Sequence, residues 1–220
     1  MTGSSGAQLS DQSPENSTLS GFGVSLAMAG EAAGMPGEAH GKGRYREGAM
    51  SSTEADQAHP TDSSLTIRST SISDGASMWT LARDCGLDLN SSYAYLIYAA
   101  DFSATCRVAL LGDEPVGYVL GYRPPERPSH LFVWQVGVSS RARGHGVAAR
   151  MIHDLLDSLD EVEVLEATVE ESNDASRALF ASIAAARGGE LAWTDGVLST
   201  DFPDEHPGEP RLEITGMRAH

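Results

Sequence analysis

The sequence predicts an α/β (α+β) fold for residues 65–220, a central sheet flanked by helices. Three observations support this. Strand-length apolar runs alternate with amphipathic runs of helical length. The turn signal Gly112-Asp113-Glu114 separates two strand-like segments, which is typical of a hairpin. A turn containing two glycines leads from the strongest strand directly into an amphipathic helix. The expected order is β-α-α-β-β-β-α-β-α-β-β.

The first half of this domain contains a strand, two helices and the hairpin. Ser73 or Asp74 can cap the first helix, and Gly86 after Cys85 can end it. The second helix has an aromatic and aliphatic face. The elements expected here are a strand at 65–69, helices from about 74 to 85 and at 92–102, and hairpin strands at 105–111 and 115–122.

The second half opens with residues 123–128, whose three prolines lack N–H donors and therefore predict a loop. Residues 131–138 form the best strand in the chain. The helix that follows the glycine turn has Met151, Leu155, Leu156 and Leu159 on its buried side. The remaining elements are expected at 163–169 (strand), 173–186 (helix), 191–194 and 211–215 (strands).

Residues 1–64 differ in composition from the rest of the chain. They are rich in Gly, Ser, Ala, Glu and Gln, and their few large apolar residues have no period. Such a segment cannot bury enough apolar surface to offset the entropy of ordering it, so we expect a disordered, low-complexity tail. Residues 65–220 then form one domain of ordinary size.

The charge of the chain excludes several classes of function. Eight acidic and three basic residues give the tail −5 of the net −16, which leaves −11 for the domain. We therefore expect no nucleic-acid partner and no attachment to an anionic membrane. The acidic surface can attract a cationic substrate or can simply keep the protein soluble in salt.

The two cysteines, Cys85 and Cys106, lie in apolar stretches and predict core packing, with neither a disulfide framework nor a metal site. The sequence shows no apolar run of about 20 residues and no secretory signal. We expect a cytoplasmic protein without a membrane span.

The glycine turn is the most informative segment. A strand ends at Val136-Gly137-Val138, Arg141-x-x-Gly144-x-Gly146 follows, and a helix begins at once. This arrangement points unpaired N–H groups and the positive end of a helix dipole at one place, as a bound pyrophosphate requires. A dinucleotide-binding turn would need a third glycine where Ala149 stands, and a Walker loop would need Gly-Lys-Ser/Thr. A glycine turn without a ligand is the remaining alternative.

This segment resembles the acetyl-CoA motif of the GNAT superfamily, and the order of elements from Leu65 onward agrees with it. The resemblance implies a GNAT fold with a mixed, mostly antiparallel sheet and acetyl-CoA as co-substrate. It implies that the pantetheine arm pairs with the main chain of Val136 and Val138, and that a bulged amide near Val138 polarises the thioester carbonyl. Asn173 would face the pantetheine or cap its helix. The residues implied at the pyrophosphate are Arg141, Arg143, Gly144, His145, Gly146, Val147 and Ala148.

The sequence departs from the superfamily at one position. Many GNAT enzymes have a tyrosine that protonates the departing thiolate, where this chain has Phe180. Phenylalanine has no proton to give. Water or another residue must then do this work, or the thiolate leaves unprotonated.

A finer resemblance concerns the acceptor. Several separated segments are similar to the diaminobutyrate acetyltransferases of ectoine biosynthesis, an osmotic-stress pathway: they lie at 87–95, 122–128, 131–136, 165–169, 173–180 and 202–206. The resemblance implies transfer of acetyl to the 4-amino group of L-2,4-diaminobutyrate, by direct attack in a ternary complex, in a homodimer.

Carboxylates suit a doubly cationic diamino acid. Asp88 could orient an ammonium group or be a helix cap. Glu166, an acid inside a strand, is expected to orient the amine or act as general base. Trp134 is expected either to pack in the core or to make a cation–π contact. Tyr93 is expected to bind substrate or to pack, and His206 is a further base candidate.

The sequence is also compatible with three other interpretations. Arg123 or Arg127 could meet the substrate carboxylate or form structural ion pairs. The chain could be a GNAT enzyme for another small amine, such as a polyamine or an antibiotic. It could also be a non-catalytic GNAT-fold sensor that binds acyl-CoA.

Overall fold

The computed structural model describes residues 64–218, so the predicted tail at 1–64 lies almost entirely outside the described residues. The strands are β1 (Leu65–Ser69), β2 (Arg107–Leu111), β3 (Glu114–Tyr122), β4 (His130–Val138), β5 (Val164–Thr168), β6 (Glu190–Val197) and β7 (Glu209–Thr215). The helices are α1 (Gly75–Asp84), α2 (Ser92–Asp101), α3 (Val147–Asp157) and α4 (Asp174–Arg187), with short 3-10 turns at Ile72–Asp74, Ser103–Thr105 and Ser199–Asp201.

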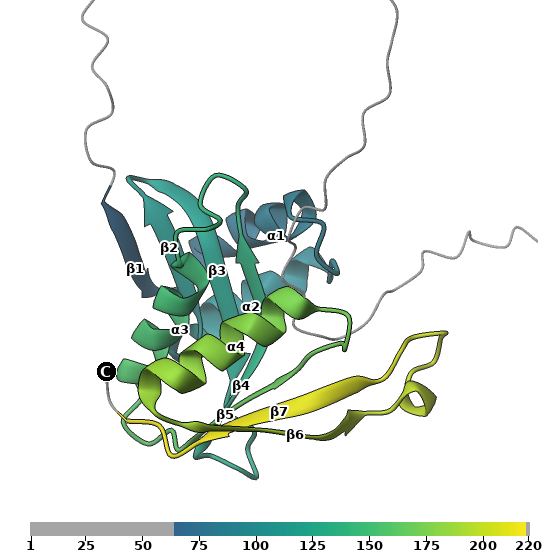
Figure 1. The fold of residues 1–220 in the computed structure, drawn as a ribbon. Coiled ribbons are helices and arrows are strands. Elements are labelled where there is room, and N and C mark those ends of the chain that lie inside the picture. Colours follow the sequence, from purple (N-terminus) through teal and green to yellow (C-terminus); the bar gives the residue numbers. More distant parts are fainter. Residues whose placement is uncertain (1–63, 219–220) are drawn as a thin grey trace, which may run out of the picture.

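The seven strands form one sheet in the order β1-β2-β3-β4-β5-β7-β6. Every neighbouring pair is antiparallel except β4 and β5, which are parallel. Helices α3 and α4 cover one face of the sheet, and α1 and α2 lie behind the other (Figure 1). The predicted element order and the mixed, mostly antiparallel sheet are confirmed. Three strands differ by two residues or more, because β2 begins at Arg107 instead of Thr105, β6 runs from 190 to 197, and β7 begins at Glu209 instead of Arg211.

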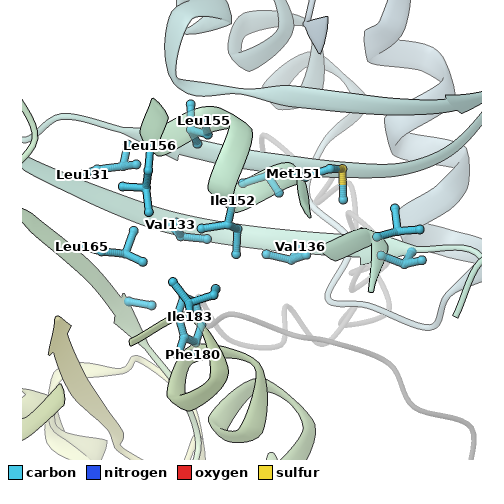
Figure 2. Close-up of a cluster of buried hydrophobic side chains, with 14 of the residues drawn as sticks. Leu131, Val133, Val136, Met151, Ile152, Leu155, Leu156, Leu165, Phe180 and Ile183 are labelled. Atoms are coloured by element: carbon cyan, nitrogen blue, oxygen red, sulfur yellow. The ribbon is translucent and has the colours of Figure 1, made fainter. Parts of the chain in front are cut away.

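The larger core lies between the sheet and helices α3 and α4. Figure 2 shows Phe180 and Ile183 of α4 pointing toward side chains of the sheet and of α3. Phe180 is fully buried there. Alternate residues of β5 and β7 face this core, since Leu165, Ala167, Leu212 and Ile214 belong to it. The residues between them, including Glu166, Thr168, Glu209 and Arg211, therefore lie on the opposite face, which α1 and α2 share.

A second core lies under α1 and α2 and contains Met78, Tyr95, Tyr118 and both cysteines. Cys85 and Cys106 are free and buried, as predicted. Burial raises the pKa of the Cys106 thiol to about 12. This core holds α1 and α2 on the sheet, and with them the loop between these helices that carries Asp88.

Among residues 64–218, no helix has the length and apolar character needed to cross a membrane.

Candidate active site

Strands β4 and β5 diverge in the middle of the sheet. They pair over only three residues each, His130–Phe132 against Val164–Glu166. Strand β4 continues to Val138 along β3, but its edge toward β5 has no partner beyond Phe132 among the described strands. An edge of this kind presents N–H and C=O groups to which an extended ligand can bind.

The irregularity that accompanies this divergence lies at Trp134. Val133 pairs with Gly121 and Gln135 with Leu120, so Trp134 is an extra residue in β4. An extra residue strengthens the local twist of a strand. The bulge predicted near Val138 is therefore misplaced, since pairing is regular from Gln135 to Val138.

The same extra residue moves side chains to unexpected faces. Phe132, Trp134 and Val136 alternate in the sequence, which predicts a single face for all three. Val136 instead joins the core under α3 and α4, while Trp134 packs with the residues under α1 and α2. Trp134 stacks on Tyr98 with ring centroids 4.6 Å apart. A simple alternation cannot reveal one inserted residue, because the insertion reverses the pattern beyond it.

The glycine turn has the geometry of an anion site. Gly144 and Gly146 have φ angles of 77° and 68°, which L side chains rarely adopt. Gly146 is the N-cap of α3 and offers no side-chain acceptor, so the first N–H groups of this 11-residue helix are left for another partner. A Cβ on either glycine would meet no protein atom within 4 Å, and the space above the turn is open.

The three polar residues predicted at this turn have partners in the protein. Arg141 donates from Nη1 to the Glu114 carboxylate at 2.7 and 2.9 Å. Arg143 Nε donates to the Val138 carbonyl at 3.0 Å, and His145 Nδ1 lies 2.9 Å from the Arg143 carbonyl oxygen. The Cys85 thiol also donates to the Val138 carbonyl. Arg143 thus links the turn to the end of β4.

Ser139, which also lies at the glycine turn, was not predicted from the sequence. The Ser139 hydroxyl oxygen is buried and has no hydrogen-bond partner among the described residues. A buried hydroxyl without a partner is costly. Its place, between the end of β4 and the glycine turn, suits a polar group of a bound ligand.

Asn173 caps α4, because its side chain accepts a hydrogen bond from the Ser176 amide at 3.0 Å.

Acidic side chains from three separate segments gather on the other side of the β4–β5 divergence. We call Asp88, Glu170, His206 and Glu209 the acidic cluster. His206 Nε2 lies 3.7 Å from Glu170 Oε1 and 3.9 Å from Glu209 Oε1. The Thr168 hydroxyl donates to Glu209 Oε2 at 2.7 Å. His206 is held in place by stacking on Phe202, with ring centroids 4.1 Å apart. Asp88 lies close enough to Glu170 and His206 to interact with their charges, so the predicted residues Asp88 and His206 belong to one site.

The carboxyl groups of Glu209 and Asp88 in this cluster have raised pKa values and are therefore more easily protonated than ordinary carboxyl groups. Burial, supported by the charges of Glu170 and Asp88 and opposed by Thr168 and His206, raises the pKa of the Glu209 carboxyl group to about 7. Burial and Glu170 raise the pKa of Asp88, and His206 opposes this. Like charges brought together in a buried place resist ionisation. An added cation would relieve this repulsion, so the cluster is suited to receive an ammonium group.

Glu209, Glu170 and Thr168 are the functional candidates that the sequence did not reveal. Glu209 lies in an acid-rich stretch with Asp204 and Glu205, and sequence alone does not rank these three. No local signal marks Glu209, which becomes the first residue of β7 only through its pairing with β6. Burial distinguishes Glu209 from its two acidic neighbours in the sequence. Glu209 is 1% exposed, whereas Asp204 and Glu205 are exposed.

Glu166 lies in a different neighbourhood from Asp88 and His206. It is fully buried, and its Oε2 accepts from Arg127 Nη2 at 3.0 Å and from Arg211 Nη1 at 2.5 Å. Its Oε1 contacts His130 Nδ1. We call Glu166, Arg127, Arg211 and His130 the arginine cluster. Both oxygens of Glu166 are thus engaged by basic side chains.

The loop that carries Asp88 is tied to β4 by Gln135. Gln135 Nε2 donates to the Asp88 carbonyl at 2.9 Å. Its Oε1 accepts from the Tyr95 and Tyr118 hydroxyls at 2.9 and 2.7 Å, which fixes the orientation of the amide. The position of Asp88 is therefore set from the same strand whose edge is open. Tyr93, by contrast, is 68% exposed at the start of α2.

Comparison with known proteins identifies the family. A profile of the acetyltransferase (GNAT) family matches residues 76–184. The L-2,4-diaminobutyric acid acetyltransferase of Marinococcus halophilus is 42% identical over 154 residues, which cover 69% of this chain and 90% of that protein. The corresponding protein of Nocardia farcinica is 42% identical over 151 residues, which cover 67% of this chain and 78% of that protein.

The chain belongs to the L-2,4-diaminobutyric acid acetyltransferase family.

Structural comparison agrees with membership of the diaminobutyric acid acetyltransferase family. The diaminobutyrate acetyltransferase of Paenibacillus lautus, in complex with its substrate L-2,4-diaminobutyric acid and coenzyme A, is 37% identical with a TM-score of 0.66, over 69% of this chain and 95% of that one. Ard1 from Thermoplasma volcanium, at 16% identity and a TM-score of 0.56, shares the fold. The GNAT fold and the family resemblance drawn from the sequence are confirmed.

Proposed function

We propose that this chain is an acetyl-CoA-dependent N-acetyltransferase that acetylates the 4-amino group of L-2,4-diaminobutyrate, giving N4-acetyl-L-2,4-diaminobutyrate for ectoine biosynthesis. Family membership supports the reaction. The observation that carries the site assignment is the acidic cluster beside the open edge of β4. This cluster contains the buried carboxyl group of Glu209, which has a pKa of about 7. A cationic amine and an extended thioester would meet there.

The described residues fit acetyl-CoA. The pyrophosphate would bind at the N-terminus of α3, on the amides between Arg143 and Ala148, with the unpaired Ser139 hydroxyl beside it. The pantetheine arm would pair with the open edge of β4. Because the Val138 carbonyl already accepts from Arg143 and Cys85, the groups between Trp134 and Gly137 are the better partners.

The chemistry needs a base and an oxyanion donor. We assign the base role to Glu209 in place of Glu166, whose two carboxylate oxygens are engaged by basic side chains. The Glu209 carboxylate accepts a proton from the 4-ammonium group, directly or through one water. The neutral nitrogen attacks the thioester carbon, the C–S bond then breaks to release the CoA thiolate, and the nitrogen loses its second proton to solvent as the amide forms. A β4 amide at the Trp134 bulge would stabilise the oxyanion.

The other members of the acidic cluster would bind the amine without moving protons. Asp88 and Glu170 would pair with the substrate ammonium groups, and His206 would hold the carboxylates of Glu170 and Glu209 at their observed spacing. Trp134 and Tyr93 stay predicted substrate contacts, and Asn173 stays a predicted neighbour of the pantetheine. Phe180 is buried and cannot protonate the thiolate. The proton held by Glu209, or a proton from solvent, would therefore be transferred to the sulfur.

The first experiment is turnover of acetyl-CoA by the purified full chain with L-2,4-diaminobutyrate, ornithine and lysine, with the acetylated nitrogen assigned by NMR. Preferential N4-acetylation of diaminobutyrate is expected. Faster turnover of another amine would make the chain a GNAT enzyme for a different acceptor. Bound CoA without turnover on any diamine would make it an acyl-CoA sensor.

We further propose that the protein is a cytoplasmic homodimer that requires no metal. The family resemblance supports the dimer. Light scattering after size-exclusion chromatography should give twice the chain mass of 23.2 kDa. Dialysis against a chelator should leave turnover unchanged, although the ligand atoms of Glu170, His206 and Glu209 lie within 4.8 Å of one another and could hold an ion. Loss of turnover with recovery on adding one metal would overturn the metal-free assignment.

A further inference from the structure

The arginine cluster carries a net positive charge inside a strongly acidic protein. Arg127 and Arg211 together contribute +2 and Glu166 contributes −1, so the cluster is +1 even with a neutral His130. The side chains of Arg211 and Arg127 are 24% and 45% exposed, whereas Glu166 is fully buried. The excess charge therefore faces outward from a buried carboxylate that holds it.

The cluster also has hydrogen-bond donors to spare. A guanidinium has five N–H groups in a rigid fork, which matches a carboxylate with two parallel bonds. Arg127 and Arg211 each give one nitrogen to Glu166, and Arg211 also lies 5.7 Å from the centre of the Phe132 ring. Among the described residues no other acceptor takes the remaining N–H groups of these two arginines. A second carboxylate could be bound beside Glu166.

The arginine cluster and the acidic cluster lie next to each other on one face of the sheet. Glu166 and Thr168 are two residues apart on β5, and Arg211 and Glu209 are two residues apart on β7. Thr168 contacts Glu209, and Glu166 contacts Arg211. Two residues along a strand span about 6.5–7 Å. The positive and the negative group are therefore adjacent.

A diamino acid matches this pair of charges. The 4-amino nitrogen of 2,4-diaminobutyrate is four bonds from its carboxylate carbon, which is about 5 Å when extended. One molecule can thus place its amine at Glu209 and its carboxylate near Arg211. Anchoring the carboxylate also holds the 2-amino group away from the thioester.

We propose that Arg211 and Arg127, oriented by Glu166, bind the α-carboxylate of the acceptor and make the enzyme selective for a diamino acid over a simple diamine. This inference rests on the proposed function. Glu166 then acts as a positioning residue, and the arginines determine specificity. An exclusively structural cluster would hold the strands together without distinguishing the two kinds of acceptor.

The test compares L-2,4-diaminobutyrate with 1,3-diaminopropane, which is the same molecule without its carboxylate. The wild type, Arg211→Gln and Arg127→Gln are assayed for kcat/KM on both. The ratio of the two values is independent of how much of each variant is folded. Loss of a charge-assisted bond should reduce kcat/KM for diaminobutyrate by about 10- to 100-fold and leave the value for diaminopropane nearly unchanged.

The matched control is Arg123→Gln. Arg123 lies on the same loop as Arg127 but pairs with the exposed Glu161, so the ratio should keep its wild-type value. Arg211→Lys should recover only part of the selectivity, because lysine has the charge without the fork. Equal losses on both acceptors in both arginine variants would overturn the carboxylate site. A wild type that acetylates neither compound would instead overturn the proposed function.

Discussion

Glu209 must be ionised to accept a proton, and its buried position resists that ionisation. With a pKa of about 7, half of the carboxyl groups are ionised at neutral pH. This value suits a general base, whose pKa should lie close to the working pH. It results from the fold, because Asp88, Glu170 and Glu209 are brought together from three distant segments. No local sequence pattern could have predicted it.

Replacement of Glu209 by Gln should reduce kcat/KM for diaminobutyrate by about 10²- to 10⁴-fold, because the amine loses its proton acceptor. Since the ionised form is the active one, wild-type kcat/KM should fall about tenfold per pH unit below pH 7. Steady-state rates measured from pH 5 to 9 check both effects. Glu205→Gln, which changes an exposed acid in the same segment, is the control. Retention of most activity by Glu209→Gln would return the base role to Glu166.

The same group should make stability depend on pH. The folded-state pKa of about 7 lies above the ordinary value of 4.5, so Glu209 stabilises the fold fully below pH 4.5 and this contribution is lost as the pH rises through 7. Glu209→Gln should therefore be more stable than the wild type at pH 8, by roughly 1–3 kcal/mol, and similar to it at pH 4. Urea unfolding at both pH values measures the difference. A variant less stable than the wild type at pH 8 would contradict the raised pKa.

At the scale of elements, hydrophobic periodicity was sufficient to place the helices and strands. The alternation of Leu65–Ser69 and the buried stripe of α3 are local signals that tertiary packing reinforces. The bulge at Trp134 was not predictable, because one inserted residue changes the pairing without changing the composition. The first two residues of β7, Glu209 and Pro210, were not predicted. β7 is an inner strand, and Pro210 lies opposite the irregular pairing between Thr194 and Val197 of β6, where a missing N–H donor is tolerated.

Gln135 connects two elements that the reaction needs in register, the strand β4 and the loop between α1 and α2. Gln135→Leu removes the bond to the Asp88 carbonyl. We expect a severalfold higher KM for diaminobutyrate with little change in the KM for acetyl-CoA, because the amine pocket moves relative to the thioester. Steady-state kinetics with each substrate varied in turn give both constants.

The control for Gln135→Leu is Thr105→Val. It removes a buried hydroxyl that donates to the Gly121 carbonyl away from the loop of Asp88. Thr105→Val should lower stability without changing either KM. If Gln135→Leu raised both KM values equally, the effect would be a general loss of structure and not a displacement of Asp88.

For the whole molecule, composition predicts a boundary near residue 64, and the first strand begins at Leu65, as the alternation of residues 65–69 predicts. The net charge of −16 bears on partners and solubility but not on the fold. The substrate followed from family resemblance, since charge and periodicity alone do not distinguish one small amine from another.

Removal of residues 1–63 should leave kcat and both KM values unchanged, because these residues lack the apolar content to contribute to a core. Kinetics of the truncated and full chains at equal concentrations check this. A large loss of turnover in the shorter chain would show that the segment has a role in catalysis.

If CoA binds along the open edge of β4 as proposed, it should also stabilise the sheet. A seven-stranded sheet with a gap between its fourth and fifth strands is two half-sheets joined over three residues. Amide hydrogens of β4 that face the gap should exchange with solvent deuterium faster than those that face β3, and bound CoA should slow only the former. The cofactor would then act as a missing strand, and heat resistance should rise with its concentration as binding linkage requires. Depletion of acetyl-CoA would leave a strand edge open for pairing with other chains.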